Sequence, residues 1–320
     1  MVAESVQVRV DSEFAPLRTV VVAQSEFKAP SDAALVGSPL PVEPGAEELL
    51  NAVRGREFGA VYPERQRAWE AERDALAALL RSHRVEVLRP RLFTAAEKAA
   101  AGPAGYANFF VRDPWFTVGD AVVEGGLRFP HRRMEVLPSR ELLVERVLPT
   151  DASYVALPRP GIDGGPFLEG GDVLVLGKQI LVGCSGMATD ELGIRWLAKY
   201  LSPQGFTVTP VRLPAHVLHL DCALSLVRDG LLIACPARLP DGLPAPLRGW
   251  EVIEVDEDEA AAMATNGLPI DAHTYVTDPE FDRVGAQLAA HGITVEYVDF
   301  SVSRLFGGAF RCSTQPLLRA

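Results

Sequence analysis

The sequence predicts an α/β protein in which a unit of about 50 residues recurs along the 320-residue chain. Three segments each hold two apolar, β-branched runs around a short polar turn, which is typical of β-hairpins. Helical stretches and single short strands separate these segments. Polar residues at the start of successive units lie 56, 50, 47 and 46 positions apart, from Asp113 to Glu169, His219, Asn266 and Cys312. A period of this length indicates a radially or linearly repeated architecture. Its mixture of strands and helix differs from the all-β blades of ordinary propellers.

The composition permits a large core and disfavours several classes of partner. The chain is 48% hydrophobic, and its net charge of −11 argues against nucleic acid or an anionic membrane as the main partner. There is no run of 18 apolar residues to span a bilayer, and Met1–Ser12 lacks a signal-peptide core. We therefore expect a soluble, cytoplasmic protein, and we leave open whether it forms a homo-oligomer.

The cysteines and histidines show no spacing that is typical of a metal site. The four cysteines are far apart and form no CxxC pair, and the six histidines form no HExxH motif. In a protein without a secretion signal, such cysteines are expected to be reduced thiols. We therefore expect neither a structural disulfide nor a bound metal.

The N-terminal third is predicted to alternate strands with one long helix. Leu17–Ala23 is an apolar, β-branched run and is predicted to be a buried strand. Residues 29–62 are rich in Pro, Gly and Ala, and we expect a long loop with one short helix near Ala46–Val53. Loops of this length are often functional, so the segment is a candidate lid. Pro63–Ser82 has proline at its first position and apolar residues at helical spacing, so it is predicted to be an amphipathic helix that leads into a strand at Arg84–Leu88.

The repeating part begins with hairpins at Asn108–Glu124, Phe167–Cys184 and Leu218–Cys235. Their turns contain a glycine beside a polar residue, which suits tight reversals. The intervening helices are predicted at Ser139–Val147, Thr189–Tyr200, Asp256–Thr265 and Pro279–His291, and the single strands at Tyr154–Leu157, Val208–Leu213, Val252–Val255 and Val295–Phe300.

Near the C-terminus, Cys312 lies in the segment Gly-Gly-Ala-Phe-Arg-Cys-Ser-Thr, beside Arg311. A thiol is a useful nucleophile only as the thiolate, and a neighbouring cation lowers its pKa. We therefore expect Arg311 to help activate Cys312. The alternative is a small, buried, unreactive cysteine, which is common in protein cores.

If the repeated units surround an axis, their first polar residues converge on a common centre. His219 and Asp221 belong to His-Leu-Asp, and the two-residue period of a strand would point both side chains the same way. Carboxylates match a planar guanidinium, a thiolate can attack its carbon, and a histidine can pass a proton to the leaving amine. Each motif alone also has an ordinary structural interpretation. The aspartate before proline fits a turn, Glu-Gly-Gly-Asp fits a loop, and the histidine fits a core or surface position.

Four motifs in this order, FVRDP, FLEGGDVL, HLD and GGAFRC, resemble those of the guanidino-group modifying superfamily with the pentein fold. That superfamily contains arginine and agmatine deiminases, dimethylarginine dimethylaminohydrolases and arginine:X amidinotransferases. The resemblance extends from about Phe14 to Leu317, nearly the whole chain. It implies a single domain over 1–320 with a five-fold pseudosymmetric α/β propeller of ββαβ repeats.

The resemblance also implies roles for individual residues. Cys312 corresponds to the nucleophile and His219 to the general acid and base. Asp113 and Asp221 correspond to carboxylates that hold the guanidinium, and Glu169 orients the histidine or holds another nitrogen. The implied chemistry passes through a covalent thiouronium-type intermediate and requires no cofactor or metal.

Further stretches are similar to particular branches of the superfamily. Thr189–Trp196 is similar to a helix motif of amidinotransferases, and Arg238 follows His219 by 19 residues, where those enzymes keep an arginine for the donor's carboxylate. Arg132 and Arg133 are alternative carboxylate binders by analogy with deiminases. The chain departs from the amidinotransferase pattern at Arg311, where those enzymes usually have histidine. Asn108 and Asn266, at the starts of two units, complete the predicted substrate-binding residues.

The sequence therefore predicts a cysteine-dependent enzyme acting on arginine or a related small guanidino compound. Our first expectation is amidino transfer to an amine acceptor, and the alternative is a hydrolase that yields citrulline or a ureido product. A non-catalytic binding protein with the same fold is the hypothesis from another class. A metal-dependent, arginase-like hydrolase would need metal-ligand spacing that the sequence does not show.

Overall fold

The computed structural model describes residues 7–31, 47–161 and 164–320, and it has a mixed α/β fold. Four three-stranded sheets share one plan, in which an antiparallel hairpin is followed by a third strand that runs parallel to the hairpin's second strand. These sheets are β6 (Trp115–Val118), β7 (Ala121–Glu124) and β8 (Ser153–Ala156); β9 (Val173–Leu176), β10 (Gln179–Cys184) and β11 (Thr207–Arg212); β12 (Leu224–Arg228), β13 (Leu231–Ala234) and β14 (Glu251–Glu254); and β15 (Leu268–Asp271), β16 (Thr274–Thr277) and β17 (Thr294–Tyr297).

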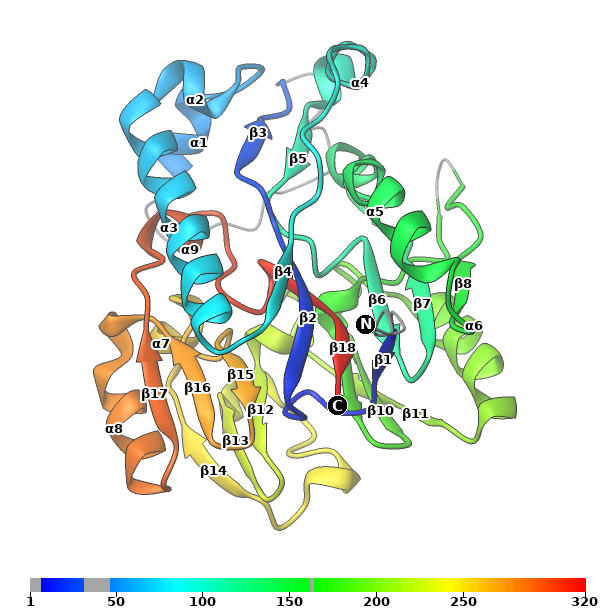
Figure 1. Ribbon diagram of the computed structural model, residues 1–320, viewed down its shortest axis with the longest axis vertical. Helices are drawn as coiled ribbons and strands as arrows, with labels where there is room; N and C mark the ends of the chain where they lie inside the picture. Colours follow the sequence, from blue (N-terminus) through cyan, green and yellow to red (C-terminus); the bar gives the residue numbers. More distant parts are fainter. Residues whose placement is uncertain (1–6, 32–46, 162–163) are drawn as a thin grey trace, which may run out of the picture.

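A further sheet repeats the plan with strands from opposite ends of the chain. Strand β18 (Thr314–Arg319) pairs antiparallel with β2 (Leu17–Val22), and β2 pairs parallel with β4 (Glu86–Leu88). The short strand β1 (Arg9–Val10) pairs with the other edge of β18. Figure 1 shows β18 in red between the two blue strands β1 and β2. The first and last parts of the chain thus share one hydrogen-bonded sheet.

The predicted hairpins are confirmed as β6–β7, β9–β10 and β12–β13. Their turns contain Gly119, Gly177 and Gly230, each with a positive φ that favours glycine. The fourth hairpin, β15–β16, was not predicted, and neither was β18. The predicted strand at Val295–Phe300 ends at Tyr297, because helix α9 (Ser301–Arg304) begins four residues later.

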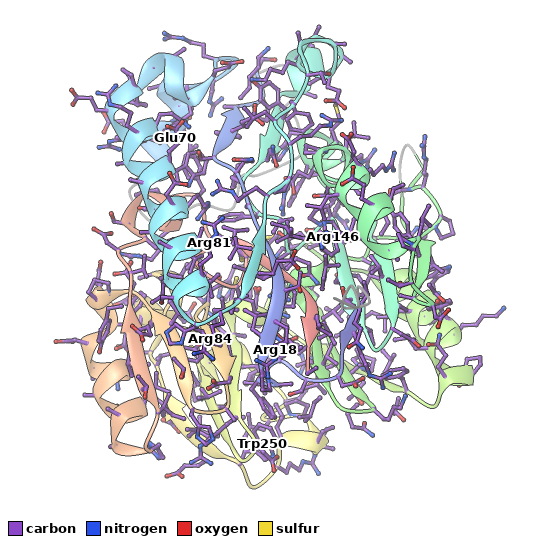
Figure 2. All side chains as sticks on the ribbon, viewed as in Figure 1. Arg18, Glu70, Arg81, Arg84, Arg146 and Trp250 are labelled. Carbon is purple, nitrogen blue, oxygen red and sulfur yellow. The ribbon has the colours of Figure 1, made fainter. Side chains whose placement is uncertain are left out.

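The predicted helices are confirmed, although the one expected at Asp256–Thr265 ends already at Ala261. The longest, α3 (Pro63–Ser82), has the predicted bounds and buries Trp69, Leu76 and Leu80. The helix ends at Ser82, and two residues later Arg84, which is labelled in Figure 2, adopts a φ of 62°. The other predicted helices of the repeating part are α5 (Leu137–Val147), α6 (Glu191–Leu201), α7 (Glu257–Ala261) and α8 (Asp282–Ala290).

The segment predicted as a long loop at 29–62 contains two short helices in its described part. These are α1 (Glu47–Ala52), which confirms the expected short helix, and α2 (Phe58–Val61), which was not predicted. Residues 32–46 of this segment lie outside the described residues, so its role as a lid stays a prediction. The remaining elements are β3 (Glu26–Lys28), which pairs with β5 (Tyr106–Asn108), and α4 (Ala95–Ala101).

An aromatic cluster lies over one end of the repeating part. Phe306 stacks on Trp69 with ring centroids 4.4 Å apart, and Phe27, Phe58 and Phe109 contact the same pair edge-on or tilted. The members come from β3, α2, α3, the segment after β5 and the loop after α9. We call these five residues the aromatic cover. Among the described residues, no helix is both long enough and apolar enough to cross a bilayer.

Candidate active site

The polar residues that precede the first strand of each sheet come together. Asp113 precedes β6, Glu169 precedes β9, His219 precedes β12, Asn266 precedes β15 and Cys312 precedes β18. His219 Nε2 lies 2.9 Å from Glu169 Oε2, and its Nδ1 lies 3.7 Å from Asp113 Oδ1. Asn266 Oδ1 accepts hydrogen bonds from the backbone N–H of Cys312 at 3.1 Å and of Ala309 at 3.0 Å. The repeat thus places one functional side chain per unit at a common point.

The local backbone at two of these positions differs from the predicted strand. Glu169 caps a 3-10 turn at Gly170–Asp172, and His219 caps a similar turn at Leu220–Cys222. The expectation that His219 and Asp221 share one face of a strand is therefore wrong. His219 has extended backbone and Asp221 lies inside the turn. Both side chains still reach the site, because the two turns pack together through a hydrogen bond from Leu220 N to Asp172 Oδ1.

His219 is held as a cation. Burial alone lowers the pKa of an imidazole, but the charges of Asp113 and Glu169 and the Glu169 hydrogen bond outweigh burial and raise the pKa of His219 to about 10. The imidazolium in turn helps to keep the pKa of Asp113 below its usual value, although burial opposes this. His219 Nδ1 has no hydrogen-bond partner in the described protein. This site therefore contains an acid with an unused N–H.

Arg132 places a second cation on the same carboxylates. Its guanidinium bonds Asp113 Oδ2 at 2.7 Å, Glu135 at 2.7 and 2.8 Å, and Glu169 Oε2 at 3.4 Å. All four side chains are buried. Burial raises the pKa of Glu135 to about 8, with further contributions from the nearby Asp113 and Glu169. We call these residues the Arg132 network.

Arg311 forms the corresponding network on the other side of the thiol. Its guanidinium bonds both oxygens of Glu13, at 3.1 and 3.2 Å, and Asp221 Oδ2 at 2.9 Å. It also donates to the backbone carbonyls of Gly171 and Val173. Despite burial, the charge of Arg311 keeps the pKa of Glu13 down at about 2. We call these residues the Arg311 network.

The expectation that Arg311 activates Cys312 is wrong, because its guanidinium is directed toward Glu13 and Asp221. The Cys312 thiol is 2% exposed and lies 3.7 Å from Asp221 Oδ2. Burial first, and then the charges of Asp221 and Asp113, raise the pKa of Cys312 well above its ordinary value. In the free protein this cysteine is therefore a neutral thiol beside an imidazolium.

A cavity of about 40 Å³ joins the thiol to the aromatic cover, which is space for a few water molecules. Its polar wall contains Cys312, His219, Asp113, Arg132 and His131, and its apolar wall includes members of the aromatic cover. An ion in this space has little water around it, so its charge interacts strongly with the polar wall. The full set of lining residues is Phe27, Leu50, Phe109, Phe110, Asp113, His131, Arg132, Leu218, His219, Phe306, Gly307 and Cys312.

Among the predicted binding residues, Asp221 and Asn266 contact Cys312 without lining the cavity, and Arg238 and Asn108 lie elsewhere. The guanidinium of Arg238 bonds Glu257 and the carbonyls of Cys222 and Ala260, and it does not line the cavity. Asn108 donates to Glu26 at 2.8 Å and to the carbonyl of Arg91 at 3.1 Å.

Sequence reasoning also missed several residues of the site. The Arg132 partner Glu135 could be found from the i, i+3 spacing of the two residues. Glu13 could not, because it meets Arg311 across 298 positions of the chain. His131, which lines the cavity, was also missed. Arg133, the other arginine considered as a carboxylate binder, donates to the carbonyls of Leu127 and Arg128 instead.

The fold creates one grouping that resembles a metal site. Ligand atoms of Asp113, Glu169 and His219 lie within 4.8 Å of one another, although their sequence spacing gave no such signal. However, the raised pKa keeps a proton on His219, and Arg132 already pairs with both carboxylates. A metal would have to displace two cations, so these residues fit a cationic organic group better than a metal ion.

Comparisons with known proteins agree with this geometry. Residues 106–244 match the family model described as arginine deiminase. The chain is 31% identical over 246 residues to the uncharacterized protein YkgA of Bacillus subtilis, covering 76% of this chain and 78% of that protein. It is 28% identical to a putative inosamine-phosphate amidinotransferase of Streptomyces griseus, covering 81% and 82% of the two chains. A solved inosamine-phosphate amidinotransferase from Streptomyces griseus superposes with a TM-score of 0.82 at 25% identity, over 98% of this chain and 97% of that one.

Proposed function

The chain belongs to the guanidino-group modifying superfamily, and from that premise we propose that it is an enzyme that transfers the amidino group of arginine or a related guanidino compound to an amine. One observation carries this proposal: a thiol, an imidazolium and the Asp113 carboxylate line a small cavity beneath the aromatic cover, and two further carboxylates contact the thiol and the imidazolium. We also propose that the sheets surround a common axis as a five-fold pseudosymmetric propeller in one domain. Their shared strand plan and the convergence of their first polar residues support this arrangement.

Substrate binding would begin with an exchange of cations. A substrate guanidinium is positively charged, and its N–H groups match the carboxylates of Asp113 and Asp221. Since Arg132 occupies Asp113 Oδ2, the substrate must replace Arg132 there. The released Arg132 can then pair with the carboxylate of an arginine substrate. Asp221 lies next to the thiol, so a guanidinium on Asp221 places its carbon close to Cys312 Sγ.

The same exchange would activate the nucleophile. In the free protein, burial and then the charges of Asp221 and Asp113 disfavour the thiolate of Cys312. A substrate cation between these groups offsets the two negative charges and lowers the thiol pKa. The thiolate therefore forms mainly when substrate is present. This dependence protects an otherwise reactive cysteine from unrelated electrophiles.

The chemical steps follow from these positions. The Cys312 thiol loses its proton to solvent when the substrate cation binds. Sγ then forms a bond to the guanidino carbon, and in amidino transfer the carbon–nitrogen bond to the substrate's chain breaks while His219 donates a proton to the departing amine. Glu169 holds the imidazole through Nε2, which leaves the Nδ1 proton available. The incoming nucleophile then gives a proton back to His219 and attacks the Cys312-bound amidino carbon, and the carbon–sulfur bond breaks.

Amidino transfer and hydrolysis to citrulline differ in the bond that breaks and in the second nucleophile. In transfer, arginine loses ornithine and an amine then takes the amidino group. In hydrolysis to citrulline, a terminal carbon–nitrogen bond breaks, ammonia leaves with a proton from His219, and water then attacks the adduct that still carries the substrate's chain. The similarity to amidinotransferases over about four fifths of the chain favours transfer. The arginine deiminase family match over residues 106–244 favours hydrolysis as the second candidate. A non-catalytic binding protein would not require a thiol and an imidazolium that both face one cavity.

The test is product analysis by mass spectrometry with arginine alone and with a panel of amines (glycine, hydroxylamine, lysine and aminocyclitols). Ornithine that forms only with an amine, together with an amidinated amine, would establish transfer. Citrulline and ammonia without any amine would establish hydrolysis. A Cys312→Ser variant is expected to lose turnover and the covalent adduct in either case. If the wild-type protein forms none of these products and Cys312 does not react with an alkylating haloamidine, the enzymatic proposal fails.

A further inference from the structure

The cavity contains a second histidine that the proposed chemistry has not used. His131 follows β7 in a short 3-10 turn (Pro130–Arg132) and lines the same cavity as Cys312 and His219. It is 6% exposed, and its ring stacks on Phe129 with centroids 5.8 Å apart and planes 24° apart. The stack fixes the ring plane without using either ring nitrogen.

His131 differs in bonding from the polar residues around it. Asp113 and Arg132 belong to the Arg132 network, His219 bonds Glu169, and Cys312 contacts Asp221. In the described part of the protein, the ring of His131 forms no hydrogen bond. Because the cavity is only about 40 Å³, whatever fills it touches most of the wall. A buried imidazole without a protein partner is therefore a binding group for an occupant of the cavity.

The two histidines of the cavity carry opposite charge states. Burial and the adjacent Arg132 lower the pKa of His131 to about 3, so its ring is neutral and one nitrogen is a hydrogen-bond acceptor. His219 is protonated and is a donor. When the environments of two titratable groups shift their pKa values in opposite directions, this is a general sign that the groups have different roles in one site.

The reaction has one group that this acceptor suits. In the proposed complex, the N–H groups that stay on the amidino carbon face the carboxylates Asp113 and Asp221. The nitrogen that leaves receives a proton from His219 and carries N–H bonds of its own. A nitrogen that enters must present its lone pair to the carbon while its N–H bonds find acceptors. His219 can accept one of them once it has lost its proton, and a second acceptor is needed.

We propose that His131 supplies this second acceptor, binding an N–H of the exchanging amine as it leaves and as its replacement enters. The proposal rests on the proposed function. It makes His131 a specificity-determining residue for amine substrates, in addition to the residues that hold the guanidinium. Since a ring this weakly basic does not keep a proton, its part is to orient the amine rather than to deprotonate it.

The experiment compares His131→Phe, which retains an aromatic ring against Phe129, with His131→Gln, which restores an acceptor. His216→Phe is the matched control, because His216 is an exposed histidine outside the cavity. Each variant is assayed for ornithine release from arginine, for amidino transfer to the best amine of the panel, and for alkylation of Cys312 by 2-chloroacetamidine. The chloride that leaves in the last reaction has no N–H bond, so His131 has nothing to bind there.

His131→Phe is expected to lower kcat/KM for ornithine release and for transfer about tenfold, the usual effect of one lost hydrogen bond to a neutral group. Alkylation by 2-chloroacetamidine should stay at the wild-type rate, and His131→Gln should recover most of the loss. Equal turnover in His131→Phe and wild-type protein would overturn the inference alone, as would a loss that includes the alkylation. Wild-type protein that neither releases ornithine nor reacts with 2-chloroacetamidine would overturn the proposed function, and this inference with it.

Discussion

Two buried arginines flank the Cys312 thiol, and they are bonded in different ways. Arg311 donates to Glu13, Asp221 and two backbone carbonyls, and its side chain is 2% exposed. Within the described residues Arg132 donates only to carboxylate side chains, and it lines the cavity. A side chain tied to backbone carbonyls cannot leave without stranding them, whereas a carboxylate can accept another cation in exchange. We therefore interpret Arg311 as a structural residue that stays in place and Arg132 as the residue that a substrate guanidinium can displace.

The strongest test of this difference is Arg311→Met. It leaves Glu13 and Asp221 buried without their cation and two backbone carbonyls without a donor. We expect the free energy of unfolding to fall by ~3–5 kcal/mol, the usual cost of removing one partner of a buried ion pair. Chemical denaturation would measure it, with Arg18→Met as the control because Arg18 is exposed (Figure 2). A decrease in the free energy of unfolding no greater than that of the control would contradict this structural role of Arg311.

Asp221→Asn separates the two functions of the carboxylate that touches both Arg311 and the thiol. It removes a proposed guanidinium ligand, so turnover should fall about 100- to 1,000-fold, as for other single groups that stabilise a reacting charge. It also removes one of the two charges that raise the Cys312 pKa, so the pKa should drop and the thiolate fraction at pH 7 should rise.

Iodoacetamide, which is uncharged, should therefore alkylate Cys312 of Asp221→Asn faster at pH 7 than it alkylates the wild-type protein. In the wild type the same rate should keep increasing as the pH rises above 9, because the thiol pKa lies above its ordinary value. Mass spectrometry over a pH series measures both rates. A wild-type rate that levels off below pH 7 would mean that the free protein already holds a thiolate.

Arg132→Met tests whether Arg132 is the arginine that the substrate displaces and that then binds the substrate's carboxylate. Its loss should destabilise the fold less than Arg311→Met, since Glu135 readily takes up a proton and His219 still faces Asp113 and Glu169. Because the released Arg132 is proposed to pair with the carboxylate of arginine, kcat/KM for arginine should fall about 10- to 100-fold. For agmatine, which lacks that carboxylate, it should change little. Equal losses for the two substrates would assign Arg132 to the guanidinium or to the fold.

The smallest expected effect is that of a chelator. Since Arg132 and the imidazolium already neutralise the grouping of Asp113, Glu169 and His219, we expect activity after dialysis against EDTA to match the undialysed enzyme. Added zinc should compete with arginine if it binds at all. Activity that disappears with EDTA and returns with a divalent metal would favour the metal-dependent alternative.

The sequence predicted the parts of the fold that depend on local pattern. The three hairpins with glycine turns and the helix Pro63–Ser82 are in place because their apolar spacing determines which face is buried. The hairpin β15–β16 escaped prediction because Pro269 interrupts a run of only four residues. Strand β18 contains Pro316 and takes its neighbours β1 and β2 from the far end of the chain, which no local pattern reports.

The site likewise has features that the sequence predicted and features that it did not. The repeat period correctly predicted that Asp113, Glu169, His219 and Cys312 lie close together, because each occupies the same point of its unit. Their charge states depend on burial and on long-range partners. The Cys312 pKa is therefore raised by burial and by Asp221 and Asp113, although the neighbouring Arg311 had been expected to lower it. Arg238 shows the reverse error, since a matching sequence distance from His219 does not place a side chain in the cavity.

The sheet shared by β1, β2 and β18 bears on when the enzyme gains its activity during synthesis. The Cys312 segment is fixed by Asn266 and by strand β18, and β18 needs β2, which the ribosome makes about 290 residues earlier. A nascent chain can form its middle hairpins while the nucleophile is still absent. With Cys312 as the proposed nucleophile, catalysis would begin only when the last strand joins the first, and a chain cut before Cys312 would keep the carboxylates and histidines of the site but lack its thiol.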